Sequence, residues 1–282
     1  MNGLRRAAAL SYTLATLTLV GLSAAQQSAG TLKPALTDEQ IEDFLLNARI
    51  GDSKEISVGV NNTRRATLSR GEITHDAQFQ YVDVSMLVFN PPGRPAELNF
   101  KDSYRYNIAA YKVSRLLGVQ QVPVSVERRI DAKSGSVTWW VDDVRMDERG
   151  RMKNPKTGWP PARTWAQTYR LRVFDALIAN TDRNVGNMLW TTDGTLWMID
   201  HTRAFRLTEK LTSPQVLVRC ERGMFEAMRK LTEESVKEAV KSSLTGDEIK
   251  AMLKRRDLIV ALFEAKIAKN GEQVALYSFD AK

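Results

Sequence analysis

Apolar residues recur at helical spacing in four long stretches of the chain, and two of these stretches begin with a capping signal. Thr37 with Gln40, and Thr245 with Glu248, have the spacing of a capping box, in which each side chain bonds the other residue's backbone N–H. Gly118 stands where a helix would end, because glycine readily adopts the left-handed conformation of a C-cap. The pattern predicts helices over residues 37–50, 103–119, 162–180 and 249–270.

Alternation of apolar and polar residues predicts strands on both sides of the second helix. The pair Asp193-Gly194, between two short apolar runs, indicates a hairpin with a type I′ turn. A polar, proline-bearing stretch at residues 143–160 separates a β-rich part from a helix-rich part, so the predicted fold class is α+β with two lobes. The predicted strand regions are residues 54–69 (two strands around a turn), 72–84, 122–130, 136–144, 187–190 and 196–200.

The first 25 residues have the pattern of a secretory signal peptide. Arg5 and Arg6 precede an uncharged apolar run over residues 7–22, and Ser-Ala-Ala at 23–25 offers small residues for cleavage. We therefore expect export to the periplasm or the medium, with residues 26–54 forming a linker and a helix. The alternative is an uncleaved anchor, because the run approaches the ~17 residues that span a bilayer. Only in that case is a membrane expected as a partner.

Composition and charge narrow the class of protein. The chain has 282 residues, of which 43% are hydrophobic, so it can bury a substantial core. Its net charge of +8 comes from Lys and Arg residues mixed with acids and forms no basic tract. Nucleic acid is therefore not an expected partner, whereas attraction to an anionic ligand is. The single cysteine, Cys220, excludes an intramolecular disulfide and a thiolate metal cluster, and its apolar neighbours indicate inert packing.

Two short motifs carry the candidate chemistry, "NTDRNVGN" at residues 180–187 and "WMIDHTRAF" at residues 197–205. Asp182 follows the end of a predicted helix, Asn187 precedes the first strand of the hairpin, and Asp200 ends the second strand. The hairpin should therefore bring Asn187 close to Asp200. One carboxylate and one amide oxygen suit Mg²⁺, whose remaining ligands can be phosphate oxygens. A calcium loop is disfavoured, because the further ligands and the terminal Glu of such a loop do not follow.

Together the two motifs resemble the catalytic and metal-binding loops of the atypical kinases. This group includes the phosphatidylinositol 3-/4-kinase-like, HipA-like and secretory-pathway kinases. The resemblance extends over roughly residues 55–265 and is specific in the two loops. It implies a kinase-like fold with a β-rich lobe at residues 55–143 and a mostly helical lobe at residues 144–282.

The resemblance also implies roles for the loop residues. Asp182 would be the catalytic base or the acid that positions the substrate, Asn187 a metal ligand, and Asp200 the principal metal ligand. The implied cofactors are ATP and Mg²⁺ or Mn²⁺. Arg183 is secondary, and we expect it to order the loop by an ion pair.

Farther upstream the resemblance is more general. The stretch "GVNNT", with Gly59, Asn61 and Asn62, is similar in position to the loop that covers the nucleotide phosphates. Trp139 and Trp140 should alternate across a strand, so that one packs in the core and the other, Trp140, lines the adenine slot. Gly59, Asn61, Asn62 and Trp140 are therefore expected nucleotide-binding positions.

One departure from the atypical kinases concerns their pairing of a strand Lys with an acid on the following helix. The corresponding positions hold Gln80, in "DAQFQ", and Asn107, in "YRYNIAAY". These two amides can hydrogen-bond each other and a phosphate, but they lack the positive charge. Lys101 and Arg105 are the candidates to supply that cation from the start of the helix.

Three functions follow from these residues. The first is transfer of a phosphoryl group from ATP to a hydroxyl of a protein, glycan, lipid headgroup or small molecule. The second is a non-catalytic scaffold of the same fold, suggested by the missing Lys and acid. The third is a metal-dependent transferase that moves a nucleotidyl group. Fold alone does not choose among the acceptors.

Overall fold

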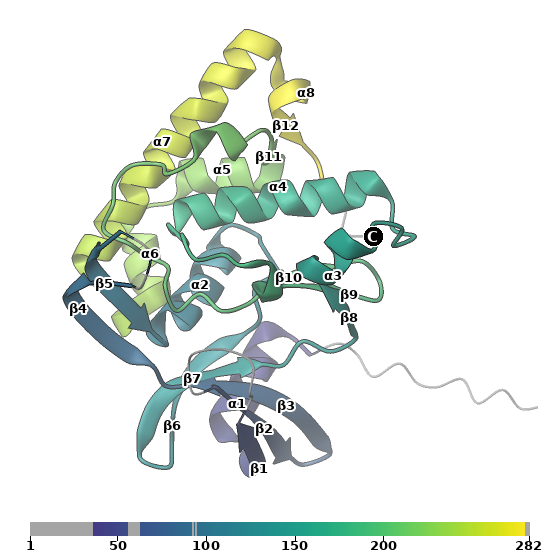
Figure 1. Cartoon of the computed structure of the whole chain (residues 1–282), viewed down its shortest axis with the longest axis vertical. Coiled ribbons are helices and arrows are strands. Elements are labelled where there is room, and N and C mark those ends of the chain that lie inside the picture. The colour runs from purple at the N-terminus through teal and green to yellow at the C-terminus, as the bar shows by residue number, and fades with distance from the viewer. Residues whose placement is uncertain (1–35, 56–62, 92, 94, 280–282) are drawn as a thin grey trace, which may run out of the picture. The chain divides into compact units, whose positions relative to one another are not determined.

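The computed structural model describes residues 36–55, 63–91, 93 and 95–279. Its amino-terminal part is an antiparallel sheet with the strand order β1-β2-β3-β7-β6 (Figure 1). Alternate side chains of the central strands face the core, and Ala66 of β2 stands opposite Ala77 of β3, both buried. The strands are β1 (Arg49–Glu55), β2 (Thr63–Arg70), β3 (Ile73–Gln80), β6 (Ser125–Ile130) and β7 (Lys133–Trp139).

Two helices pack against this sheet through β6 and β7. They are α1 (Asp38–Asn47) and α2 (Arg105–Leu116). Both bonds of the capping box between Thr37 and Gln40 are present, which confirms the start predicted for the first helix. Gly118 follows α2 with φ of 70°, in the left-handed region that favours glycine, so the predicted end is confirmed as well.

A hairpin of two strands, β4 (Asp83–Phe89) and β5 (Glu97–Ser103), stands between β3 and α2 in the chain. The sequence predicted one continuous strand over residues 72–84, and that prediction is wrong because the chain leaves the sheet after Gln80. The residues of β4 are almost all exposed. They therefore lack the alternation of buried and exposed positions by which a strand is recognised.

The carboxyl-terminal part is mainly helical. Its long helices α4 and α7 pack together, and α5 and α6 contact α7 (Figure 1). The capping box of Thr245 and Glu248 is formed at the start of α7, as predicted. The helices are α3 (Glu148–Lys153), α4 (Pro161–Leu177), α5 (Arg222–Lys230), α6 (Glu233–Val240), α7 (Gly246–Asn270) and α8 (Glu272–Ala275). None of the described helices has the length and apolar character needed to cross a membrane.

Two small sheets complete this part, and one of them carries the predicted hairpin. The three-stranded sheet has the order β10-β9-β8, and a two-stranded parallel sheet pairs β11 with β12. The hairpin turn is not type I′, because only Gly194 has a positive φ whereas type I′ requires two such residues. The Asp193 side chain instead accepts from Thr191 and Thr195. The strands are β8 (Val144–Asp147), β9 (Met188–Thr191), β10 (Leu196–Met198), β11 (Cys220–Glu221) and β12 (Leu276–Tyr277).

A β-sheet region followed by a helical region is the α+β class predicted from the sequence. Large side chains fill the core of the helical region, and Phe174, Trp190, Phe205 and Phe263 are almost completely buried. This core supports the loop between α4 and β9, on which the candidate site depends.

Candidate active site

The β9–β10 hairpin brings the two candidate metal ligands together. Asn187 ends a short 3-10 helix (Val185–Asn187) just before β9, and Asp200 follows β10 with a positive φ of 55°. Their side chains approach to 3.4 Å between Nδ2 of Asn187 and Oδ2 of Asp200. The backbone N–H of Ile199 also donates to the Asn187 carbonyl. The proximity expected from the hairpin is therefore present in the structure.

Gln80 and Asn107 form a buried amide network that reaches Asp200. Nδ2 of Asn107 donates to Oε1 of Gln80 at 2.7 Å and to Oγ of Ser136 at 3.1 Å. Nε2 of Gln80 lies 3.5 Å from Oδ1 of Asp200, and the backbone N–H of His201 donates to Oδ1 of Asn107 at 2.8 Å. Gln80 and Asn107 are 3% and 6% exposed, so this network is shielded from water. It connects the sheet to the loop that carries Asp200 without a charge on either amide.

Asp182 is held by an arginine that the sequence did not single out. Nη1 of Arg203 donates to Oδ2 of Asp182 at 3.0 Å, and Nη2 donates to both carboxylate oxygens of Glu97 at 2.7 and 2.8 Å. Arg206 also donates to Glu97. The only available signal was the position of Arg203 in "DHTRAF", soon after Asp200. Glu97 had no signal, because it comes from the unpredicted β5.

Arg183 orders the loop through an ion pair, as expected. Its guanidinium makes two hydrogen bonds of 2.9 Å to the Asp175 carboxylate of α4. It also donates to the backbone carbonyls of Asn187 and Ile199. Because the Arg183 and Asp175 side chains are only 9% and 11% exposed, this pair is strongly shielded from solvent. One side chain thus connects α4, the loop and the end of the hairpin.

A cavity of about 490 Å³ adjoins these loops. Gln78 and Ile199 line it, and the same two residues line a void of about 10 Å³ shared with Asn107 and Asp200, so its inner end leads to Asp200. Trp140 lines the cavity, with the Arg65 guanidinium 4.2 Å from its ring centroid. The volume is in the range of small-ligand sites. Gln78 and Ile199 were not predicted to contribute.

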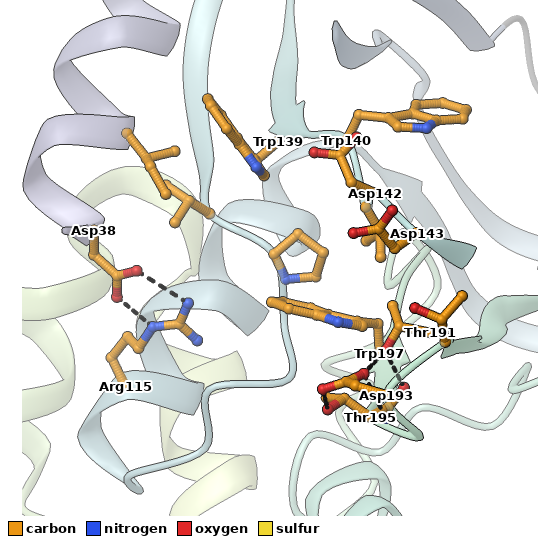
Figure 2. Close-up of a pocket in the computed structure, with 15 residues that line it drawn as sticks. Asp38, Arg115, Trp139, Trp140, Asp142, Asp143, Thr191, Asp193, Thr195 and Trp197 are labelled. Atoms are coloured by element: carbon orange, nitrogen blue, oxygen red, sulfur yellow. Dashed lines mark hydrogen bonds and ion pairs between the residues drawn. The ribbon is translucent and has the colours of Figure 1, made fainter. Parts of the chain in front are cut away.

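A further cavity, of about 510 Å³, shares residues 139–143, at the end of β7 and after it, with the cavity beside Ile199. Asp38 of α1 is paired there with Arg115 of α2, and Trp197 of β10 forms part of the wall (Figure 2). Asp200 and Asn187 are not among the residues that line it. Neither residue lines the cavity beside Ile199 either, but the small void at Asp200 shares Gln78, Thr138 and Ile199 with that cavity and only Pro123 with this one. The two motifs are therefore associated with the cavity beside Ile199.

Each of the two candidate cations forms an ion pair with a carboxylate. Lys101 donates to Glu248 of α7 at 2.8 Å, and Arg105 donates to Asp83 at 3.1 Å. The expectation that Lys101 or Arg105 replaces the missing lysine beside Gln80 therefore needs correction: in the structure each already has an acidic partner. The candidate phosphate-loop residues, Gly59, Asn61 and Asn62, lie outside the described residues.

The donor set suits a divalent cation that is shared with a nucleotide. Among the described residues no group of three or more His, Cys, Asp or Glu side chains could hold a metal. Asp200 and Asn187 instead offer one carboxylate and one amide oxygen, which matches Mg²⁺ or Mn²⁺ completed by phosphate oxygens and water. His201 adds no charge, because its burial and the nearby Arg183 cation lower the pKa of the imidazole well below its usual value of 6.5.

Comparison with known proteins finds the same fold among solved structures. No protein-family model matches the sequence, and no curated protein matches it. Among solved structures, a hydra Fam20 protein with sugar has a TM-score of 0.63 and 13% identity, covering 85% of this chain and 92% of its own. The Golgi casein kinase has a TM-score of 0.59 and 14% identity, covering 86% and 78%. The same kinase with Mn/ADP bound gives 0.59 and 14%, covering 87% and 80%.

These similarities show that the chain has a kinase-like fold, with a β-sheet amino-terminal region and a helical carboxyl-terminal region. At such low identity they establish the fold alone. The activity must therefore be argued from the site.

Proposed function

We propose that the protein is a metal-dependent phosphotransferase that binds ATP in the cavity beside Ile199 and transfers the γ-phosphoryl group to a hydroxyl. The observation that carries the proposal is the convergence of Asn187 and Gln80 on Asp200, which lines the small void at the inner end of that cavity. The Mn/ADP bound to the Golgi casein kinase is consistent with it, since that protein has the same fold. Asp200 and Asn187 would hold Mg²⁺ or Mn²⁺, which would neutralise phosphate charge.

Asp182 is the proposed catalytic residue. Arg203 occupies its Oδ2, and within the described structure no hydrogen bond engages its Oδ1, which can therefore accept from an acceptor hydroxyl. The hydroxyl proton passes to Asp182 as the new P–O bond forms. The bond from the γ-phosphorus to the bridging oxygen breaks, and ADP leaves. The loose transition state of such reactions depends mainly on alignment and charge neutralisation.

The amide network predicts an unusual dependence on the cation. Gln80 and Asn107 carry no charge, so neither side chain can offset the negative charge of the phosphates. We therefore propose that nucleotide binding is weak without a divalent cation. Trp140, with its ring at the cavity wall, is the proposed partner for the adenine.

A second candidate function is a non-catalytic scaffold. Two observations favour it: Gln80 and Asn107 satisfy each other without a charge, and Arg203 already engages Asp182. The two candidates differ in what the metal loops must do. A scaffold has no need for metal-dependent nucleotide binding, whereas the phosphotransferase has.

The deciding experiment is a calorimetric titration of residues 26–282, which include the compact unit from Leu36 onwards, with ATP and either Mg²⁺ or Mn²⁺. Wild type should bind much more tightly with the cation than without it, and Asp200→Asn should abolish that difference. Asp52→Asn, at an exposed position of β1, removes the same charge and should bind normally. Absence of metal-dependent binding in wild type would refute the phosphotransferase.

A second measurement separates catalysis from binding. Asp182→Ala should bind ATP with the cation but form ADP at least ~100-fold more slowly, because general-base contributions are typically of that size. Equal rates of ADP formation in Asp182→Ala and wild type would refute the catalytic assignment. Binding without ADP formation in wild type, with protein, glycan and small-molecule hydroxyls supplied, would favour the scaffold.

Export is a separate proposal that rests on residues 1–25. The motivating pattern is the basic start, the apolar run and the small residues at 23–25. Expression of the full chain followed by mass determination of the exported form tests it. A mature protein beginning near residue 26 is expected, and a full-length protein retained in the cytoplasm would contradict export.

A further inference from the structure

A cavity of about 410 Å³ lies beside the catalytic loop, where the end of α4 meets residues 179–183 and the segment 210–216. It is distinct from the cavity beside Ile199, since the two share no lining residue. Its walls carry several polar groups that can contact a ligand. The ones that matter here are Arg172, Thr181, Arg183, Lys210, Thr212 and Ser213.

The charges in this cavity do not balance. Three lining residues are cations, and Asp175 is the one carboxylate among the lining residues. Arg183 takes up both oxygens of that carboxylate with bonds of 2.9 Å. The side chains of Arg172 and Lys210 make no ion pair or hydrogen bond anywhere in the described part of the chain. Two uncompensated positive charges therefore face one cavity, which favours an anionic occupant.

Local structure does not account for these two cations. Arg172 precedes the last turn of α4, and that turn holds no basic residue, so the helix dipole does not explain its position. Lys210 comes from a different segment, about forty residues away along the chain. The cavity is thus assembled from separate elements. Hydroxyls of Thr181, Thr212 and Ser213 add hydrogen-bond donors on its wall.

We propose that this cavity binds an oxyanion, a phosphate or sulfate group. The guanidinium of Arg172 offers two parallel donors that match such a group, Lys210 adds a point charge, and the hydroxyls can donate to the remaining oxygens. The site lies beside the proposed catalytic residue, because Thr181 directly precedes Asp182. Arg183, on the same wall, also anchors the loop through the carbonyls of Asn187 and Ile199.

The oxyanion can be carried by the acceptor or can be a free anion. Binding itself does not depend on the proposed function, whereas its assignment to the acceptor rests on that function. If the acceptor carries it, the cavity selects hydroxyl compounds that already bear a phosphate or sulfate. If the anion is free, it acts on the loop through Arg183.

The test is a titration of residues 26–282 with inorganic phosphate and with sulfate, in EDTA, without nucleotide, at constant ionic strength. The double variant Arg172→Gln/Lys210→Gln should weaken binding at least tenfold. A matched control, Arg129→Gln/Lys269→Gln, removes the same charge at exposed positions and should bind like wild type. No binding by wild type, or equal losses in both double variants, would overturn the proposal.

A single change guards against a folding artefact. Lys210 is exposed, so Lys210→Glu should leave the melting temperature unchanged while reversing one of the two charges. Phosphate affinity in Lys210→Glu should fall below that of Lys210→Gln. Equal affinity in these two variants and wild type would also overturn the proposal.

Kinetic measurements distinguish an oxyanion carried by the acceptor from a free anion. The acceptor is a serine peptide, supplied either with or without a neighbouring phosphoserine. If the acceptor carries the anion, Arg172→Gln/Lys210→Gln should raise KM for the phosphorylated peptide at least tenfold and leave the unphosphorylated peptide unaffected. If the anion is free, added phosphate should change kcat for both peptides, and the double variant should lose that response. Phosphate binding in a protein that binds no ATP would refute the proposed kinase and leave the oxyanion site standing.

Discussion

Asn107 donates from Nδ2 to Oε1 of Gln80 at 2.7 Å, and its own Oδ1 accepts from the backbone N–H of His201 at 2.8 Å. One buried amide therefore uses both ends, one toward the sheet and the other toward the loop that carries Asp200. This arrangement consists of neutral groups that satisfy one another. It fixes the loop that carries Asp200 against the sheet whether or not the site is catalytic.

Removing this amide should destabilise the protein. Asn107→Leu leaves the His201 N–H and the Gln80 carbonyl without partners in a buried place, so we expect a loss of about 2–3 kcal/mol in the free energy of unfolding. Gln80→Leu should cost about 1–2 kcal/mol, and the double variant less than the sum. Urea denaturation measures all three. Gln215→Leu, at an exposed position, is the control and should change stability little; additive costs would mean that the two amides are not coupled.

The ion pair between Arg183 and Asp175 should matter more than any surface pair. Arg183→Gln leaves the Asp175 carboxylate almost fully buried with its charge uncompensated, so we expect a loss of about 3–5 kcal/mol. Lys237→Gln breaks an exposed pair with Glu233, which solvent screens, and should change stability far less. Denaturant unfolding of both variants checks the contrast. Similar small losses in the two variants would show that Arg183 does not order the loop.

Local features of the fold could be predicted from the sequence because their causes are local. The capping boxes need residues three positions apart, and the approach of Asn187 to Asp200 follows from a short hairpin. The lack of charge at Gln80 and Asn107 was visible in the motifs alone, although their mutual hydrogen bond required the sheet and the helix to meet. The kinase-like fold was implied by two motifs and is supported by the structural comparisons.

Asp182 is held by Arg203, which in turn is held by Glu97, and this network could not be predicted, for two physical reasons. Glu97 reaches Arg203 across 106 positions of the chain, and no local pattern encodes that contact. Its strand β5 pairs with a strand whose side chains are nearly all exposed, so the hairpin lacks the alternation that identifies half-buried strands. For the same reason the sequence predicts that Lys101 binds the nucleotide, whereas its partner in the structure, Glu248, comes from a distant helix.

The cluster of Glu97 with Arg203 and Arg206 should make stability depend on acid pH. Burial alone would raise the pKa of Glu97, but hydrogen bonds and charge from the two arginines outweigh it and hold the pKa below its usual value of 4.5. The ionised group therefore stabilises the fold at pH above 4.5, and this contribution is lost as pH falls through the lowered pKa.

Glu97→Gln tests this linkage. Because Glu97 is 30% exposed, we expect a loss of about 1 kcal/mol at pH 7, at the upper end for a partly exposed pair. The difference between wild type and Glu97→Gln should stay constant from about pH 7 to pH 5 and shrink below that, since wild type also loses the carboxylate charge. Glu209→Gln, at an exposed position, is the control. A difference independent of pH down to about pH 3 would contradict the linkage.

The thiol of Cys220 should be unreactive in the native protein. Its side chain is completely buried in β11, and burial, followed by the nearby Glu221 carboxylate, raises the pKa of the thiol well above its usual value of 9.0. Because the thiolate is the reactive form, a disulfide reagent at about pH 8 should react with Cys220 at least ~100-fold more slowly than with a free thiol. In denaturant the reaction should be complete and rapid. Fast modification of the native protein would contradict this prediction and would require β11 to open locally from its partner strand β12. Cys220→Ala, which has no thiol, is the control and should not react.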